Sequence, residues 1–304
     1  MSADTGTFRV AGTPGRDPDG TTTPHPRRSP APRAPGTSMP PRLLGELRAE
    51  WEKLRTLHST WWLLATMVVL TVAVGAASAG AVDTSACRTP ESCNEDVVKL
   101  SLTGVWPGQV AVAVLAVLAV TSEYGTGTIR TTLTAMPSRT RVLAAKALVV
   151  SALTAAAGAV AVLGSLIAGR FLVAAGGFTP AHGYERISLL DGPTARAAFG
   201  TVIFLILIAL LALGLAWAFR DTASALTIVL VLLYAFPILV SAIGDEKWAD
   251  RLTKAAPASA GMSIQATRNL DQLPIGPWPG LAILTAWSAT SLALGTLTLT
   301  KRDA

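Results

Sequence analysis

Charged residues are scarce in this chain of 304 residues, where they make up 14% of the sequence, against about 25% in an average soluble domain. Hydrophobic residues account for 51%, and the mean hydropathy is +0.48. This balance is that of an integral membrane protein. The net charge is +6, but much of the basic excess flanks hydrophobic runs, where Lys and Arg fix orientation. We therefore expect no nucleic-acid partner.

Cysteine and histidine are also rare, with two and three residues respectively. Cys87 and Cys93 lie six positions apart, which is not a metal-binding CxxC spacing, and too few histidines are present to complete a site. A disulfide forms between them if their loop faces an oxidising compartment. Two reduced thiols in a surface loop explain the same pattern, so both interpretations stay open.

Catalytic motifs are missing from the sequence. It contains no GxxxxGK[ST] phosphate loop, no HExxH, no paired glutamates and no Ser–His constellation, and the glycines at 125 and 127 lack the Lys that a phosphate loop requires. Charges are absent from the interior of every predicted span, which argues against an ion-coupled secondary transporter. We expect no catalytic residue, no bound cofactor and no metal, so any energy source must be another polypeptide.

What the chain does contain is a set of six hydrophobic runs, each close to the roughly 20 residues that cross a bilayer as a helix. They predict an all-α integral membrane protein with spans at about 61–82, 104–122, 144–168, 197–219, 222–244 and 280–300. Pro237 should kink the fifth span. Residues 245–277 are too polar to span, although they include a patterned stretch from Trp248 to Ala260.

The N-terminal residues 1–41 differ from the rest in composition, since they hold nine of the nineteen prolines. Such a segment buries too little apolar surface to fold, so we predict a disordered tail. It has no apolar core of a signal peptide, and a start at Met39 would remove it. The six-span domain then covers residues 42–304.

Residues 43–58 predict an amphipathic helix lying in the membrane interface, just before the first span. Its apolar residues fall within about 100° of one another on a helical wheel, whereas its charged residues lie outside that arc. A helix that packs on a partner protein would have the same pattern. The apolar set is Leu43, Leu44, Leu47, Trp51 and Leu54, and the charged set is Glu46, Arg48, Glu50, Glu52, Lys53 and Arg55.

A short polar segment, residues 122–146, joins two runs, 100–122 and 147–169, that contain no charge. Six spans place both ends of the chain on one side, together with this segment. Lys and Arg on that side lie in short segments at span ends, whereas those on the other side lie in longer loops mixed with acids. This distribution predicts that both termini and residues 122–146 are cytoplasmic and that the cysteine loop is external.

The same segment resembles a known family. The residues Glu123-Tyr124, Gly127 to Leu133, Pro137, Arg139, Val142-Leu143 and Lys146 are similar to the connection between the second and third spans of bacterial ABC-2 type permeases, the membrane subunits of export-class ABC transporters. Glu50, Lys53, Ser59-Thr60 and Trp62 extend the resemblance upstream. It covers residues 43–300 and leaves out the proline-rich tail.

The resemblance implies a fold and several partners. It implies a permease in the bacterial plasma membrane that pairs with a second permease subunit, identical or not, and with a separate ATP-binding subunit that carries ATP and Mg. It also implies short re-entrant helices within 245–278 at the outer face. The implied docking residues for the ATP-binding subunit are Glu123, Gly127, Thr128, Ile129, Arg130, Leu133, Pro137, Arg139 and Arg141.

Two functions are consistent with these features. The first is a permease subunit that exports an unknown substrate when the partner ATPase closes on ATP. The second is a membrane scaffold or immunity-type protein that binds a partner without transport. From residues alone, the arginines of the segment are equally well explained as topology anchors, and Glu123 as a solvated span end. We also considered that Glu123 bonds backbone amides or an Arg of the N-terminal helix.

Overall fold

The structure is a computed structural model that describes residues 43–82, 95–129, 139–179, 184, 187–242 and 244–301. Within these residues it contains helices and no strand. Six helices are long and apolar enough to cross a membrane, which confirms the predicted all-α fold with six spans. The predicted tail, Cys87 and Cys93 lie outside the described residues.

The spans follow one another along the chain with short elements between them. The first three are α2 (His58–Gly80), α4 (Val105–Gly125) and α6 (Arg139–Ala175), and the fourth is α7 (Gly192–Phe219). The fifth runs from Thr222 to Val240, and the sixth is α12 (Pro277–Lys301). Two further helices precede spans, α1 (Leu43–Thr56) before α2 and α3 (Val97–Ser101) before α4.

Helix α7 lies at the centre of the bundle, where it packs against α12, α4 and α6. Its residues Phe204, Leu205, Ile208 and Leu211 are fully buried, as expected for a helix that is apolar on all sides. Close approach to α12 depends on glycine, because a Cβ at Gly214 would lie 2.5 Å from the carbonyl carbon of Ser291. Small residues at such crossings are typical of membrane helix pairs.

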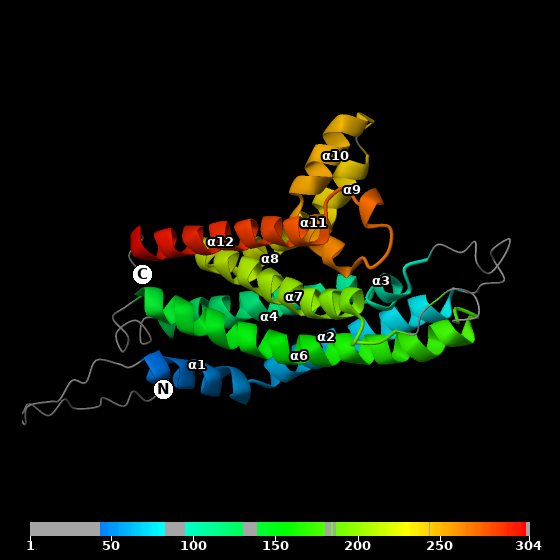
Figure 1. The fold of residues 1–304 in the computed structure, drawn as a ribbon. Coiled ribbons are helices and arrows are strands. Elements are labelled where there is room, and N and C mark those ends of the chain that lie inside the picture. The colour runs from blue at the N-terminus through cyan, green and yellow to red at the C-terminus, as the bar shows by residue number, and fades with distance from the viewer. Residues whose placement is uncertain are drawn as a thin grey trace, which may run out of the picture. The chain divides into compact units, whose positions relative to one another are not determined.

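Helix α6 is much longer than the hydrophobic run within it. Its 37 residues extend about 55 Å at 1.5 Å per residue, whereas the hydrocarbon core is about 30 Å thick. The predicted span of 144–168 therefore lengthens at both ends, where Arg141 and Arg170 are exposed. Figure 1 shows α6 running along the bundle, with α1 beside its N-terminal end.

The fifth span is interrupted before Pro237. Helix α8 (Thr222–Leu230) continues into a π-helical turn, η4 (Val231–Ala235), and then into α9 (Phe236–Ser241), with Pro237 in its first turn. Proline lacks the N–H that would bond the preceding turn, and the widened turn accommodates that loss. The Tyr234 hydroxyl of this turn donates to the Trp106 carbonyl of α4 and accepts from Gln109 Nε2 at 3.2 Å.

Short helices fill the region before the last span. They are α10 (Glu246–Ala255), α11 (Pro257–Met262), η5 (Ser263–Gln265) and η6 (Leu270–Gln272). Helix α11 packs on α12, and η5 packs on α7 and α12. This confirms the expected short helices before the sixth span, and Figure 1 shows α10 standing out from the side of the bundle.

Candidate functional site

Three helices meet at the end of the bundle where the predicted docking segment begins and ends. Helix α4 ends at Gly125, α6 begins at Arg139, and α1 packs against α6. Leu54 of α1, Val142 of α6 and Ile129 belong to one buried hydrophobic cluster. The residues on both sides of the segment are therefore held in one packed core.

Four charged side chains cross-link these three helices, and we call them the charge cluster: Glu50, Lys53, Glu123 and Lys146. Lys146 Nζ lies 2.6 Å from Glu50 Oε2 and 2.8 Å from Glu123 Oε1. Lys53 Nζ lies 2.9 Å from Glu50 Oε1 and 3.1 Å from Glu123 Oε1. Each ammonium thus bridges the same two carboxylates, so α1, α4 and α6 are joined by ion pairs as well as by packing.

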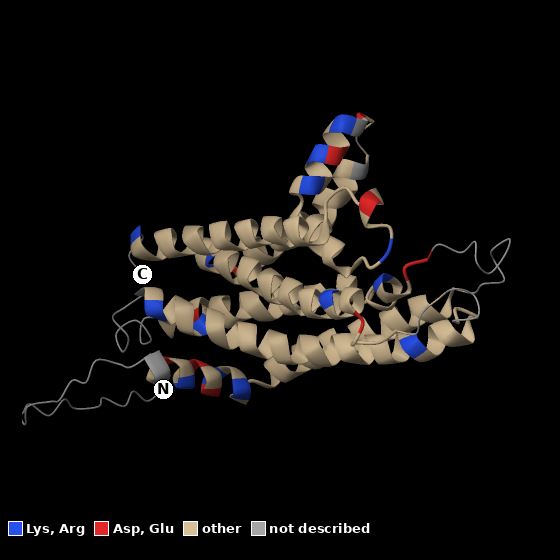
Figure 2. Cartoon of the chain, in the orientation of Figure 1, with Lys and Arg blue, Asp and Glu red and all other residues tan. Residues whose placement is uncertain are grey.

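Burial makes the charge cluster energetically important. The Lys146 and Glu50 side chains are each 1% exposed, whereas the Lys53 side chain is 41% exposed. Removing one member of a buried ion pair costs about 3–5 kcal/mol, because the remaining charge loses its compensation. Figure 2 shows acidic and basic residues gathered on α1 and on the helix ends beside it, with the middle of the long helices uncharged.

The ionisation of the two α1 residues follows from their partners. Burial raises the pKa of the Glu50 carboxyl, but the charge and hydrogen bond of Lys146, joined by those of Lys53, outweigh it and hold that pKa below 4.5. Burial lowers the pKa of the Lys53 ammonium, but Glu50 and then Glu123 outweigh it and raise that pKa above 10.5. Both groups are therefore charged at neutral pH.

A fifth charged residue, Glu46, is buried on the same helix one turn before Glu50. It is 1% exposed, and both of its carboxylate oxygens lack a hydrogen-bond partner within the described chain. Glu123 Oε2 is buried without a hydrogen-bond partner in the same residues. The face of α1 that meets the bundle therefore carries more negative than positive charge.

The face of α1 that meets the bundle includes two acidic residues. Glu46, Glu50 and Leu54 are buried, whereas Trp51 is 38% exposed. Leu47 packs partly buried against the core, and the side chains of Leu43 and Leu44 lie outside the described set. Two acidic residues of α1 thus face the bundle, where Glu50 forms an ion pair with the Lys146 ammonium of α6.

The predicted docking residues fall into three groups. Glu123 and Ile129 are buried, at 8% and 5% exposure, so neither presents its side chain to a partner surface. Gly127, Thr128 and Arg141 are exposed, and Gly127 has a φ of 71°, a backbone conformation that favours glycine. The structure does not describe Arg130, Leu133, Pro137 or the side chain of Arg139.

Sequence reasoning did not identify the charge cluster. It anticipated a bond from Glu123 to the N-terminal helix, but to an Arg, and the partners are instead Lys53 and Lys146. A signal was present, since Glu46, Glu50 and Lys53 recur at helical spacing and lie on one face. Lys146, the buried partner of Glu50, lies 96 residues further along the chain, so no local sequence pattern predicts this pair.

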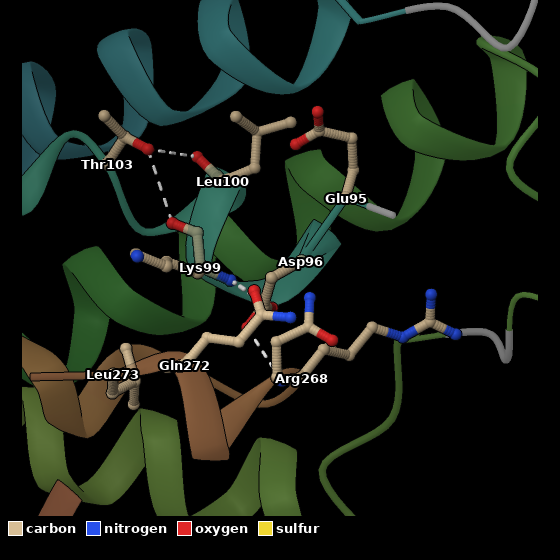
Figure 3. Close-up of a pocket in the computed structure, with 10 residues that line it drawn as sticks. Glu95, Asp96, Lys99, Leu100, Thr103, Arg268, Gln272 and Leu273 are labelled. Carbon is tan, nitrogen blue, oxygen red and sulfur yellow. Dashed lines mark hydrogen bonds between the residues drawn. The ribbon is translucent and has the colours of Figure 1, made fainter. Parts of the chain in front are cut away.

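A polar cavity of about 410 Å³ lies at the opposite end of the bundle, between α3 and the loop that contains η6. Asp96 holds its walls together, since it accepts from Thr267 Oγ1 at 2.7 Å, from Arg268 N at 3.0 Å and from Lys99 N at 3.0 Å. Figure 3 shows Asp96 between Lys99 and Arg268. Within the described chain, no group of three His, Cys, Asp or Glu side chains has the arrangement of a metal site.

Comparison with models of known protein families finds a match. Residues 46–238 match the family described as ABC-2 family transporter protein. The matched range begins at Glu46, covers the whole charge cluster and ends in the fifth span. No individual protein of curated function matches the chain at a significant level.

Proposed function

The chain belongs to the ABC-2 family of transporter membrane proteins, and we propose that it couples ATP hydrolysis on a separate subunit to outward transport. As a member of that family it is a multi-pass permease subunit of an ABC transporter. Beyond this family role, we propose that a partner ATPase docks at residues 126–141 and drives export. ATP and Mg would be bound by the partner, while this chain would bind no cofactor.

The observation that carries the proposal is the charge cluster. A push on the segment between α4 and α6 reaches Glu123 at one end and Lys146 at the other, and both residues are ion-paired to α1. Because buried ion pairs resist separation, the three helices should move together. A soluble ATPase acting at one segment would thereby move two spans and the interfacial helix at once.

The docking residues take two roles in this proposal. Gly127, Thr128 and Arg141 are exposed and would contact the ATP-binding subunit, together with Arg130, Leu133, Pro137 and Arg139. Glu123 and Ile129 are buried and would anchor the segment from beneath. Basic residues on the contact surface would pair with acids of the partner, which favours fast and specific association.

Co-purification with the candidate ATP-binding subunit tests docking. Charge reversal in Arg141→Glu should reduce the amount of co-purified subunit, whereas Arg170→Glu, at an exposed position near the other end of α6, should leave it unchanged. Failure of any ATP-binding subunit to co-purify with the unsubstituted protein would contradict the proposal. Co-purification without ATPase stimulation in proteoliposomes would instead indicate the scaffold function.

Coupling and direction need separate assays. Lys146→Met should retain the ATP-binding subunit but lower permease-stimulated ATPase activity, because it loosens α1 and α4 from α6 without altering exposed docking residues. In inside-out vesicles, export of a hydrophobic dye or a fluorescent lipid would appear as ATP-dependent uptake. Uptake into right-side-out vesicles would refute the export direction.

The orientation and assembly complete the proposal. We place the α1 end of the bundle and both termini in the cytoplasm of a bacterium, with the spans in its plasma membrane. Basic residues at short span ends support this orientation. A second permease subunit, identical or different, would complete the transport pathway. A membrane-impermeant thiol reagent applied to whole cells should fail to label Arg141→Cys in a chain whose native Cys87 and Cys93 are replaced by Ser.

A further inference from the structure

An apolar groove of about 640 Å³ runs along the bundle where α7, α8 and α12 meet. All three helices are membrane spans or parts of one, so the groove lies at the level of the bilayer. Its walls are mostly aliphatic and aromatic side chains: Leu215 and Phe219 of α7, Ile228 of α8, Leu232 of η4, and Leu294 and Leu297 of α12.

The polar atoms in the groove walls are bonded within the protein. Thr298 Oγ1 donates to the Gly295 carbonyl at 2.9 Å, and Trp287 Nε1 donates to the Ala255 carbonyl at 3.0 Å. Neither side chain therefore requires a polar guest. An apolar ligand can fill the groove without leaving a wall donor unsatisfied.

One end of the groove is different, because a basic residue, Lys301, lines it. Lys301 is exposed, and no acidic side chain within the described residues forms an ion pair with it. It lies at the last residue of α12, at the same end of the bundle as α1 (Figure 1). A second cation is close, since Arg220 donates to the carbonyl of Thr298, another lining residue, at 2.9 Å.

The length of the groove fits one leaflet. Trp287 and Lys301 both line it, and the helix between them rises about 21 Å at 1.5 Å per residue. Half of a bilayer, headgroup region included, is about 20–22 Å thick. The groove therefore reaches from the water-facing end of the sixth span to the middle of the bilayer.

We propose that this groove binds one anionic phospholipid, with an acyl chain along α12 and the phosphate on Lys301. The shape and the charge both favour this occupant. A second copy of the chain packed on the same face by a twofold axis would bring two Lys301 residues to the same level beside the axis, where their charges repel. A phospholipid instead supplies the missing negative charge and the hydrocarbon together.

Brominated lipids test the proposal, because bromine quenches nearby tryptophan and Trp287 lines the groove. The purified full chain in detergent is titrated with phosphatidylglycerol or phosphatidylcholine carrying the same brominated chains. The Trp287 signal is the difference between this protein and its Trp287→Phe variant. One basic residue at an anionic lipid surface gives about a fivefold preference, so phosphatidylglycerol should reach half-quenching at about one-fifth of the phosphatidylcholine concentration.

Two substitutions separate the headgroup from the chain. Lys301→Gln should abolish the preference for phosphatidylglycerol, whereas Arg141→Gln, which removes an exposed cation at the same end of the bundle, should preserve it. Ala218→Phe fills the groove and should reduce quenching by both lipids. Leu297→Phe, at a half-exposed position of the groove, is a second blocking variant if Ala218→Phe does not elute as a folded protein on gel filtration.

Three outcomes would overturn the proposal. Equal quenching by the two lipids would mean that the groove meets only bulk lipid. A preference that survives Lys301→Gln would mean general attraction to the basic end of the bundle. Absence of quenching at Trp287, with disulfide cross-linking of Leu294→Cys between two copies, would mean that the groove is a subunit interface. None of these results bears on ATPase docking, so the proposal stands independently of the proposed function.

Discussion

Lys146 is the residue whose removal tests the charge cluster most directly. Its ammonium group is almost completely buried and contacts Glu50 and Glu123 at 2.6 and 2.8 Å. In Lys146→Met the side chain keeps its approximate length but loses its charge. Lys53 then remains as the single ammonium between the two carboxylates, so one negative charge is left uncompensated.

The magnitude follows from the burial of these groups. Breaking a buried ion pair costs about 3–5 kcal/mol, and we expect about 3 kcal/mol because Lys53 still bridges both carboxylates. At about 2 °C or more per kcal/mol for a chain of this size, the unfolding temperature in detergent should fall by about 6 °C. Trypsin should also cleave faster after Lys53 and Arg55, because α1 is released from α6.

The matched control is Lys254→Met. Lys254 also contacts an acid, Asp250, at 2.6 Å, but both side chains are more than 40% exposed, and exposed pairs contribute about 0–1 kcal/mol. The unfolding temperature of this control should therefore stay within about 2 °C of the parent. If Lys146→Met and Lys254→Met shift the unfolding temperature equally, the charge cluster does not fasten α1 to the bundle.

Two further predictions concern pH and packing. Because the folded-state pKa of Glu50 lies below 4.5 and that of Lys53 above 10.5, their stabilisation is present between these values. It is lost as pH falls below 4.5 or rises above 10.5, so the difference in unfolding temperature between the parent and Glu50→Gln should shrink below pH 4.5. Gly214→Ala should lower stability by about 1–3 kcal/mol through overpacking against α12, whereas Gly45→Ala, which meets open space, should not; equal effects would exclude close packing as the reason for glycine at 214.

The six spans were predictable because hydropathy reports the bilayer directly. The ends of the helices were less predictable, because a helix can continue beyond the membrane into water, where charged residues are solvated. Helix α6 illustrates the difference: its uncharged run is 147–169, but the helix begins at Arg139 and ends at Ala175. Hydropathy delimits the membrane, and backbone hydrogen bonding delimits the helix.

The site was harder to predict for a different reason. The wheel pattern of α1 predicts an apolar stripe that faces the membrane interface, and it does not predict which side chains meet the bundle. The structure turns Glu46 and Glu50 inward, because a lysine on a distant span neutralises Glu50. A single sequence does not tell which of its many basic residues lies beside Glu50, so the inward orientation of Glu50 could not be predicted.

The length of α6 links the charge cluster to the opposite end of the molecule. Lys146 lies near its first turn, and near its last turns a Cβ at Gly169 would lie 2.1 Å from Ser101 Oγ of α3, the helix beside the polar cavity. Helix α6 contains no proline, the commonest cause of sharp kinks. Displacement of one end of α6 should therefore displace the other.

Spin labels at positions 141 and 170, both exposed on α6, test this rigidity. The rise between them is about 44 Å at 1.5 Å per residue, a distance that double electron–electron resonance spectroscopy can measure. The distance should be the same with and without ATP in the complete transporter, while distances from position 141 to the fifth span change. Shortening of the 141–170 distance on ATP binding would show that α6 bends, in which case the charge cluster could move without moving α3.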